Sequence, residues 1–314
     1  MKMKKFFLSI LFIFITIVLI VIFKIDYIRG SNFIGKEIIK KSFFYIKKNY
    51  VQMKYKSCFI DKNDKVINKQ ILIAGHTYGS PEDKNLSTYP KFLSILSQEP
   101  EKYDFAFLAG DIVFKANQKN FLKVKNELSS FFNSIYIAPG NHDVGLALKN
   151  ESIRNQFLSV FNKNYQKIVI NKNLFIVLDS TLNPGGISKD QMIFLRKEME
   201  NIKDIKNIFI ITHHAIWQNY TKEKIWSNAK KDLFINNNFK EVTSLLFENL
   251  KKEIKVFFIA GDFGVFKQRT VIFCEKNRNL YFIATGMGNK RLDNYLKVLI
   301  SSDGEILSIK PIFF

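Results

Sequence analysis

IYIAPGNHD, residues 135–143, is the most informative stretch of the sequence. Its first part, Ile135–Ala138, has the length and apolar composition of a buried β-strand. Asn141, His142 and Asp143 follow together on one tight loop. An amide, an imidazole and a carboxylate are ligand types suited to Mn²⁺, Fe or Zn²⁺. The stretch therefore predicts a strand that carries chemically active side chains at its carboxyl end.

The same alternation of strand and polar loop extends through residues 70–314. Amphipathic stretches of helical length separate the apolar runs, and Ser188 stands three residues before Gln191, which is a capping-box spacing. Residues 270–314 alternate strand and turn without a clear helix. The pattern predicts an α/β domain with mixed sheets covered by helices. The expected strands are Ile71–Ala74, Phe105–Ala109, Ile135–Ala138, Leu174–Leu178, Ile208–Ile211, Val256–Ala260 and Leu280–Ala284. The expected helices are Pro90–Ser97, Asn117–Phe132, Leu148–Phe161, Lys189–Met199 and Glu241–Lys252.

Composition indicates a folded protein and argues against a nucleic-acid partner. Hydrophobic residues make up 47% of the 314 residues and charged residues 24%, so the chain is not disordered. The formal net charge is +20, but more than half of that excess lies in residues 1–69. Few of the 48 basic residues are arginine, the side chain preferred for bidentate phosphate recognition. We therefore expect no nucleic acid among the partners.

The first 23 residues have the features of a membrane anchor. Lys2, Lys4 and Lys5 precede residues 6–23, a run without any charged side chain. As a helix rising ~1.5 Å per residue, this run is about 27 Å long, enough for the hydrocarbon core of a bilayer. The sequence KIDY at residues 24–27 follows, in place of the small residues of a cleavage site. This favours an uncleaved transmembrane helix over a cleaved signal peptide.

We accordingly expect a single-pass membrane protein with the lipid bilayer as a partner. Residues 24–69 form a Lys-rich connector, and residues 70–314 form a domain outside the cytoplasm, at a bacterial inner membrane facing the periplasm. Cys58 and Cys274 are too few for a disulfide scaffold or a zinc ribbon. They either form one disulfide in an exported domain or remain buried free thiols.

Further reactive side chains follow the predicted strands. Asp111 and Asp262 each come after an apolar run that ends in glycine, and all four histidines of the chain follow strand candidates. Because open α/β sheets place their sites at the carboxyl ends of strands, we expect these side chains to share one site. The four histidines are His76, His142, His213 and His214.

Residues 70–290 resemble the calcineurin-like metallophosphoesterases. The GNHD stretch is the most specific match, and the ordered series of motifs makes a chance resemblance improbable. The resemblance implies a sandwich of two mixed β-sheets flanked by helices, with a two-metal site that hydrolyses phosphate esters. The matching pieces, in family order, are Gly75-His76, Gly110-Asp111, Gly140–Asp143, Thr212–His214 and Gly261–Gly264.

The chain departs from the family pattern on one side of the site. Ala74 and Gly264 stand where the family has ligands to the first metal, and neither side chain binds a cation. The resemblance implies that the second metal keeps its ligands. We therefore expect one divalent ion per chain, Mn, Fe or Zn, in a site with open positions. The expected ligands are Asp111, Asn141, His213 and Asp262.

The resemblance also implies roles for the other side chains. His142 is expected to act as general acid on the leaving oxygen, and His76 as a second catalytic residue that hydrogen-bonds the substrate or joins the metal. His214 is expected to line the pocket and bind substrate, and Asp143 to brace its loop. Phe114 stands where many relatives have a carboxylate or amide that orients the catalytic histidine, so we expect His142 to lack that partner.

The expected function is metal-dependent hydrolysis of a phosphate ester. Anchoring favours a phosphorylated glycan or a lipid-linked substrate over a free phosphorylated small molecule. The alternative is a non-catalytic protein that binds a phosphorylated envelope component.

Overall fold

The computed structural model describes most of the chain beyond residue 31. The described residues are 32–62, 65–145, 151–183, 185–200, 202–225, 238–249, 253–265, 272–288 and 292–314. The backbone divides into two units after Lys54, and each unit is described by itself.

The first unit contributes one described helix, α2 (Asn32–Lys54). It occupies much of the expected connector and is rich in lysine. The expected anchor, residues 6–23, lies outside the described residues. Among the residues that are described, no helix combines the length and the apolar character needed to cross a membrane.

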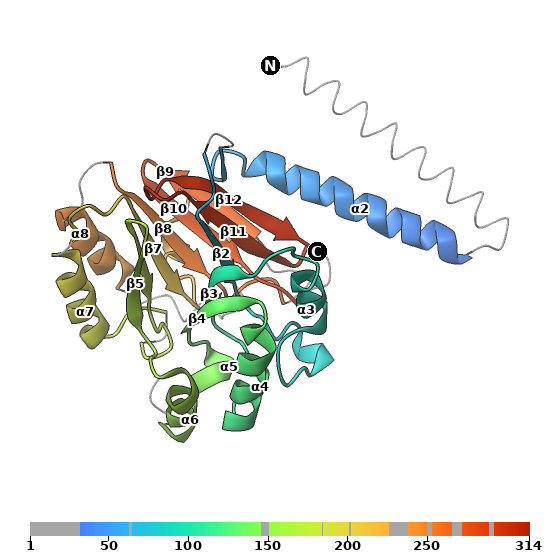
Figure 1. Cartoon of the computed structure of the whole chain (residues 1–314), viewed down its shortest axis with the longest axis horizontal. Coiled ribbons are helices and arrows are strands. Elements are labelled where there is room, and N and C mark those ends of the chain that lie inside the picture. Colours follow the sequence, from blue (N-terminus) through green and yellow to red (C-terminus); the bar gives the residue numbers. More distant parts are fainter. Residues whose placement is uncertain are drawn as a thin grey trace, which may run out of the picture. The chain divides into compact units, whose positions relative to one another are not determined.

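The second unit, residues 55–314, contains two six-stranded sheets (Figure 1). In the first sheet β2, β3 and β4 run parallel, and β11, β12 and β1 add antiparallel pairs on one side. In strand order its members are β1 (Ile60–Asp61), β12 (Ile306–Phe313), β11 (Asn294–Ile300), β2 (Lys69–Ala74), β3 (Tyr103–Ala109) and β4 (Phe132–Ala138).

The second sheet has a parallel centre with antiparallel edges. β6, β7, β8 and β10 are parallel, and β5 and β9 close the two sides. Both sheets are therefore mixed, as expected from the sequence. In strand order the members are β5 (Gln166–Ile170), β6 (Asn173–Val177), β7 (Asn207–Thr212), β8 (Lys255–Ala260), β10 (Leu280–Thr285) and β9 (Ile272–Asn277).

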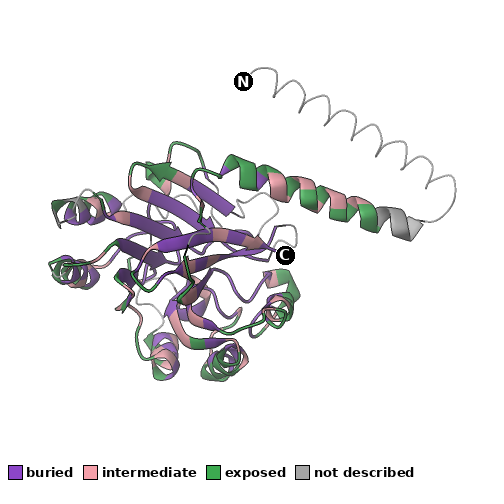
Figure 2. Ribbon diagram, turned by 45° about the horizontal axis from the view of Figure 1, so that its top comes forward, coloured by how far each residue is buried: buried purple, intermediate pink, exposed green. Residues whose placement is uncertain are grey.

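The helices cover the outer sides of the sheets. Figure 1 shows α7 (Lys189–Met199) and α8 (Phe239–Asn249) beside the second sheet, and α4 (Gln118–Ser129) and α6 (Glu151–Phe161) near β3 and β4. Figure 2 shows mostly buried strands and helices whose outer faces are exposed. Ser188 caps α7 by accepting a hydrogen bond from the Gln191 backbone N–H, as the capping-box spacing predicts. The remaining short helices are α3 (Pro90–Leu96), α5 (Asn141–Val144), η1 (Pro81–Asp83) and η3 (Gln218–Tyr220).

An aromatic ladder joins the two sheets. Phe175, Phe209, Phe257 and Tyr281 are register partners on neighbouring strands of the second sheet, and their rings stack at 4.4–4.7 Å. Phe107 of β3 stacks on Phe175 at 4.6 Å from the other sheet. Stacked, fully desolvated rings bury a large apolar area, so this ladder fixes how the sheets face each other. It thereby sets the distance between the loops that follow β3 and β7.

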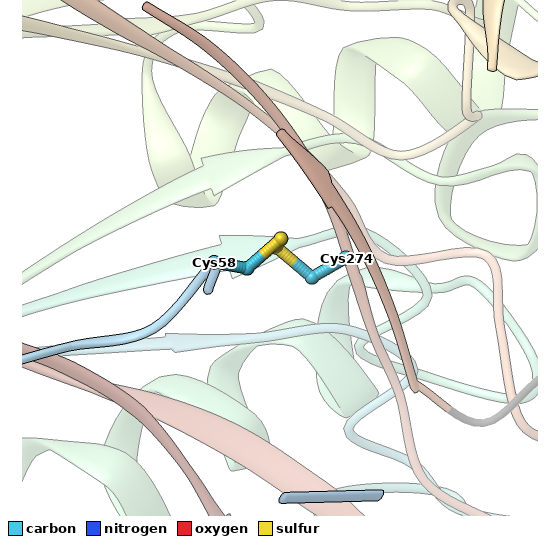
Figure 3. The surroundings of a disulfide bond; sticks show 2 residues. All are labelled: Cys58 and Cys274. Carbon is cyan, nitrogen blue, oxygen red and sulfur yellow. A yellow bond between two sulfur atoms is a disulfide. The ribbon is translucent and has the colours of Figure 1, made fainter. Parts of the chain in front are cut away.

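Two sets of contacts outside the central core join segments that are far apart in the sequence. Cys58 forms a disulfide with Cys274 of β9, with a Cα–Cα distance of 6.0 Å (Figure 3). Of the two alternatives left open by the sequence, the structure therefore has the disulfide. At the end of the first sheet, the Glu99 carboxylate accepts hydrogen bonds from Lys297 Nζ and the Tyr295 hydroxyl, both at 2.9 Å.

Candidate functional site

The candidate site lies where the carboxyl ends of strands from both sheets meet. His76 follows β2, Asp111 follows β3, and Asn141 and His142 begin α5 directly after β4. From the second sheet, His213 and His214 follow β7 and Asp262 follows β8. Backbone hydrogen bonds join these loops, including His76 N–H to the Gly110 carbonyl at 3.0 Å and Asp262 N–H to the His213 carbonyl at 2.9 Å. The two sheets thus bring the seven predicted residues to one place.

His213 is the centre of the predicted metal-ligand set. Its Nδ1 lies 3.1 Å from the Ala109 carbonyl, which can only accept, so Nδ1 carries the proton and Nε2 keeps its lone pair. Nε2 then faces three oxygens: Asn141 Oδ1 at 3.0 Å, Asp111 Oδ1 at 3.5 Å and Asp262 Oδ1 at 3.9 Å. Two ligand atoms that share one cation at ~2.1 Å each are at most about 4.2 Å apart.

All three separations fall within that limit. A histidine whose second nitrogen donates to a carbonyl is the usual arrangement of a metal-binding imidazole. A lone pair on Nε2 facing two carboxylates and an amide oxygen is also repulsive unless a cation lies between them. The donor set therefore fits a divalent ion, with His213, Asp111, Asn141 and Asp262 as the residues that would hold it.

Two glycines allow this close approach. Gly110 and Asp111 both have positive φ, +77° and +55°, so the chain reverses sharply after β3. A Cβ at Gly110 would lie 2.5 Å from His213 Nδ1, and a Cβ at Gly140 would overlap the Asp111 carboxylate. A side chain at either position would separate the ligands, which explains why glycine precedes both motifs.

Asp143 fastens the two ligand-bearing loops together. Its carboxylate accepts hydrogen bonds from four backbone N–H groups: Asp111 and Gly140 at 2.8 Å, Ile112 at 3.0 Å and Val113 at 3.3 Å. Burial and the nearby Asp111 charge raise the pKa of Asp143, and the backbone donors oppose that rise. These contacts agree with the bracing role that the family resemblance implies for Asp143.

His76 lies on the opposite side of Asp111 from His213. Its Nδ1 is 3.1 Å from the Gly79 carbonyl, and its Nε2 is 3.1 Å from Asp111 Oδ2. With Nδ1 donating to the carbonyl, the contact with the carboxylate needs either a second proton on the ring or a cation shared with Asp111. Burial opposes ionisation of Asp111, but the neighbouring His213 and the hydrogen bond with His76 lower its pKa below its ordinary range.

His142 is held by the backbone rather than by a side chain. Its Nδ1 lies 3.1 Å from the Phe114 carbonyl, and the Phe114 ring stacks on the imidazole with centroids 5.7 Å apart. Position 114 supplies no carboxylate or amide side chain, as expected, and the backbone carbonyl of Phe114 orients His142 instead. The sequence cannot predict this contact, because the backbone carbonyl that accepts the hydrogen bond is present with any residue at position 114. His142 and Asn141 are half-buried, whereas the other residues of the site are buried.

His214 is buried behind the site and contacts Ser180. Its Nδ1 lies 3.0 Å from Ser180 Oγ and 3.2 Å from the Ser180 carbonyl. Burial lowers the pKa of His214 to about 3, so the ring is neutral at pH 7. Side-chain ligand atoms of His213, His214 and Asp262 also lie within 4.8 Å of one another. That spacing is looser than the limit of about 4.2 Å for two ligands of one cation, so His214 stays a neighbour of the ligand set, as the sequence suggested.

Tyr78 is a further residue of the site that the sequence did not single out. The side chain is fully buried, with its ring 4.5 Å from His76, 5.4 Å from His142 and 5.8 Å from Phe114 between centroids. Its hydroxyl has no hydrogen-bond partner among the described residues. The feature of the sequence that could have pointed to Tyr78 is its position two residues after His76, on the short loop between β2 and η1.

The sequence is similar to known proteins over part of its length. The family profile of the calcineurin-like phosphoesterases matches residues 71–243. The probable glycerophosphodiester phosphodiesterase GpdQ of Arcobacter nitrofigilis is 26% identical over 137 residues, which cover 42% of this chain and 49% of that protein. The chain thus matches about half the length of this curated relative.

A solved structure is also weakly similar to this chain. The NAD nucleotidase NadN of Haemophilus influenzae matches with a TM-score of 0.43 and 14% sequence identity, over 78% of this chain and 49% of that one. The profile match spans more than half of the chain, and it includes the GNHD loop and the loops after β2, β3 and β7. The chain belongs to the calcineurin-like phosphoesterase family.

Proposed function

We propose that this chain is a metal-dependent phosphoric ester hydrolase that works with a single divalent ion. The observation that carries the proposal is the convergence of Asn141, Asp111 and Asp262 oxygens within 3.9 Å of His213 Nε2. Ala74 and Gly264 supply no ligand on the other side, which supports one ion, Mn, Fe or Zn, rather than two. When bound, such an ion polarises a phosphoryl oxygen and lowers the pKa of water.

The chain's own residues then divide the remaining work. His142 donates Nδ1–H to the Phe114 carbonyl, so its other nitrogen, Nε2, carries a proton to the leaving oxygen when the ring is charged. A backbone carbonyl stands in place of the acidic or amide partner of many relatives, so we expect slower catalysis than in relatives that have such a partner. His76, whose Nε2 lies 3.1 Å from the Asp111 carboxylate, would orient the substrate or complete the ion's ligands.

The substrate we favour is a phosphodiester or phosphomonoester in an envelope glycan or a lipid-linked compound. The name of the Arcobacter relative, a probable glycerophosphodiester phosphodiesterase, supports a diester. The Cys58–Cys274 disulfide supports an oxidising compartment, because disulfides persist mainly outside the cytoplasm. In this proposal residues 6–23 anchor the chain in the bacterial inner membrane, and the domain that follows the connector faces the periplasm.

A non-catalytic binder of a phosphorylated envelope component is the second candidate. The missing ligands at Ala74 and Gly264 favour it, since the family hydrolyses esters with two metals. The two candidates share the same ion and the same pocket, so turnover decides between them.

Metal content and hydrolysis together test the proposal. We expect the purified full-length chain to hold about one equivalent of metal by mass spectrometry, and His213→Ala to lose it. Asp190→Asn, an exposed carboxylate on α7, is the control and should keep the metal. Two equivalents per chain would contradict the one-ion site.

Hydrolysis is measured with bis(p-nitrophenyl) phosphate and p-nitrophenyl phosphate. General-acid assistance contributes roughly 10²–10⁴-fold, so His142→Ala should lower kcat by about that factor while the metal content stays unchanged. Equal rates for His142→Ala and wild type would remove the catalytic assignment. A metal-loaded wild type that binds phosphate without hydrolysing either ester would establish the binder instead.

A further inference from the structure

The Tyr78 hydroxyl is a buried polar group without a partner inside the site. The side chain has no exposed surface, and no described residue accepts or donates a hydrogen bond at the oxygen. Buried hydroxyls in folded proteins are nearly always paired, because losing water without a replacement is costly. Beside a reaction centre, an unpaired hydroxyl is available to a ligand that brings a hydrogen-bond partner.

The backbone holds Tyr78 firmly at this place. The Tyr78 N–H bonds to the Asp111 carbonyl at 3.4 Å, the neighbouring His76 N–H bonds to the Gly110 carbonyl at 3.0 Å, and Gly79 N–H bonds to the His76 carbonyl at 3.0 Å. The ring contacts both His76 and His142, whose rings are themselves 6.4 Å apart between centroids. The phenol is therefore fixed beside the two histidines that we place at the reacting group.

Tyr78 also lies on the side of the site that lacks metal ligands. Its loop begins at Ala74, the last residue of β2, where the family has its first ligand. A phosphoryl oxygen on that side has no ion to neutralise it. A phenol is protonated at neutral pH, so it is a hydrogen-bond donor to such an oxygen.

We propose that the Tyr78 hydroxyl donates a hydrogen bond to a non-bridging oxygen of the substrate's phosphoryl group, on the side of the site left without a metal. This inference rests on the proposed function for the identity of the ligand. The Tyr78 and His142 rings are 5.4 Å apart between centroids, so a ligand that contacts His142 lies near the Tyr78 ring. Substrate binding thereby pairs the Tyr78 hydroxyl, which, like the adjacent Thr77 hydroxyl, has no hydrogen-bond partner among the described residues.

Tyr78→Phe tests the inference because it removes one oxygen and keeps the ring packing. We expect inorganic phosphate to bind the metal-loaded, full-length variant about tenfold more weakly by calorimetry, and kcat/KM for the nitrophenyl esters to fall about 10–100-fold. Metal content should not change. Thermal stability should stay the same or rise, because the variant no longer buries an unpaired hydroxyl.

Tyr103→Phe is the matched control. The Tyr103 hydroxyl is also buried, but it lies 3.3 Å from the Tyr295 hydroxyl and belongs to a hydrogen-bonded group remote from the site. Its loss should lower the melting temperature and leave phosphate affinity unchanged. A Tyr78→Phe variant that melts earlier and binds phosphate as wild type does would overturn the inference, since the hydroxyl would then be paired within the protein.

The outcomes separate this inference from the proposed function. Wild-type hydrolysis with equal phosphate affinity and kcat/KM in Tyr78→Phe refutes the inference and leaves the enzyme proposal standing. Phosphate binding without hydrolysis, weakened in Tyr78→Phe, supports the inference and refutes the enzyme proposal. A metal-loaded wild type that neither binds phosphate nor hydrolyses an ester refutes both.

Discussion

Replacing Asp143 by alanine removes the carboxylate that ties the β3 loop to the β4 loop. In the wild type this carboxylate accepts four hydrogen bonds, from the backbone N–H groups of Asp111, Ile112, Val113 and Gly140. Asp143 has no exposed surface, so the four donors lose their partner in a buried place. The proposed metal ligands Asp111 and Asn141 stand directly on the two loops that the carboxylate joins.

The expected loss of unfolding free energy follows from the number of backbone N–H groups that lose their partner. A buried donor left unpaired costs roughly 1–3 kcal/mol, which sets an upper range of about 4–12 kcal/mol for four. Two effects reduce that value: water can enter the space of the lost carboxylate, and removing its charge relieves repulsion with Asp111. We therefore expect Asp143→Ala to lose about 3–5 kcal/mol of unfolding free energy, a size typical of a broken buried network.

The Asp143→Ala substitution should also weaken metal binding, in addition to lowering the stability. Outer partners that orient metal ligands change metal affinity by roughly 10–100-fold when they are removed, and Asp143 orients Asp111 through its backbone. Urea unfolding of the full-length chain measures the free energy, and competition with a chelating dye measures metal affinity. Asp190→Ala, an exposed aspartate on α7, is the control and should change neither. An Asp143→Ala chain within about 1 kcal/mol of wild type, with full metal affinity, would refute the view that this carboxylate holds the site together.

Other predictions concern the glycine before the GNHD motif, the disulfide and one partly buried carboxylate. Gly140→Ala should abolish metal binding, because a Cβ there overlaps the Asp111 carboxylate; a variant with wild-type metal content by mass spectrometry would contradict this. Reducing the Cys58–Cys274 disulfide, which closes a loop of 216 residues, should cost about 5 kcal/mol in the chain-entropy model; a shift below 1 kcal/mol in urea unfolding would show that the bond contributes little. Burial would raise the pKa of Glu99, but the Lys297 and Tyr295 hydrogen bonds described above lower it below its ordinary value. Its stabilising contribution is therefore present above the unfolded pKa, near 4.3, and lost as pH falls through the folded one. Glu99→Gln should be about 1 kcal/mol less stable than wild type at pH 7, with a smaller difference at pH 3, whereas a constant difference would argue against the ionised contact.

The strands and helices were largely predictable because their signals are local. The seven expected apolar runs correspond to β2, β3, β4, β6, β7, β8 and β10, and the five expected helices to α3, α4, α6, α7 and α8. Buried parallel strands read as continuous apolar runs, and the cap at Ser188 marks the start of α7 to the residue. The packing of the sheets was not predictable, because it depends on which rings of the aromatic ladder stack across strands far apart in the sequence.

By itself the sequence determined which residue types follow which strands, and hence the family and the candidate ligands Asp111, Asn141, His213 and Asp262. Only the tertiary structure decided how those side chains are held. The Phe114 carbonyl that orients His142 and the amides that bind Asp143 are backbone groups, and every residue has them, so no sequence pattern marks them. The pairing of Cys58 with Cys274 and the unpaired Tyr78 hydroxyl likewise depend on where distant segments meet. Residue identity sets the available chemistry, but hydrogen bonds form over about 3 Å, and only the fold brings groups within that distance.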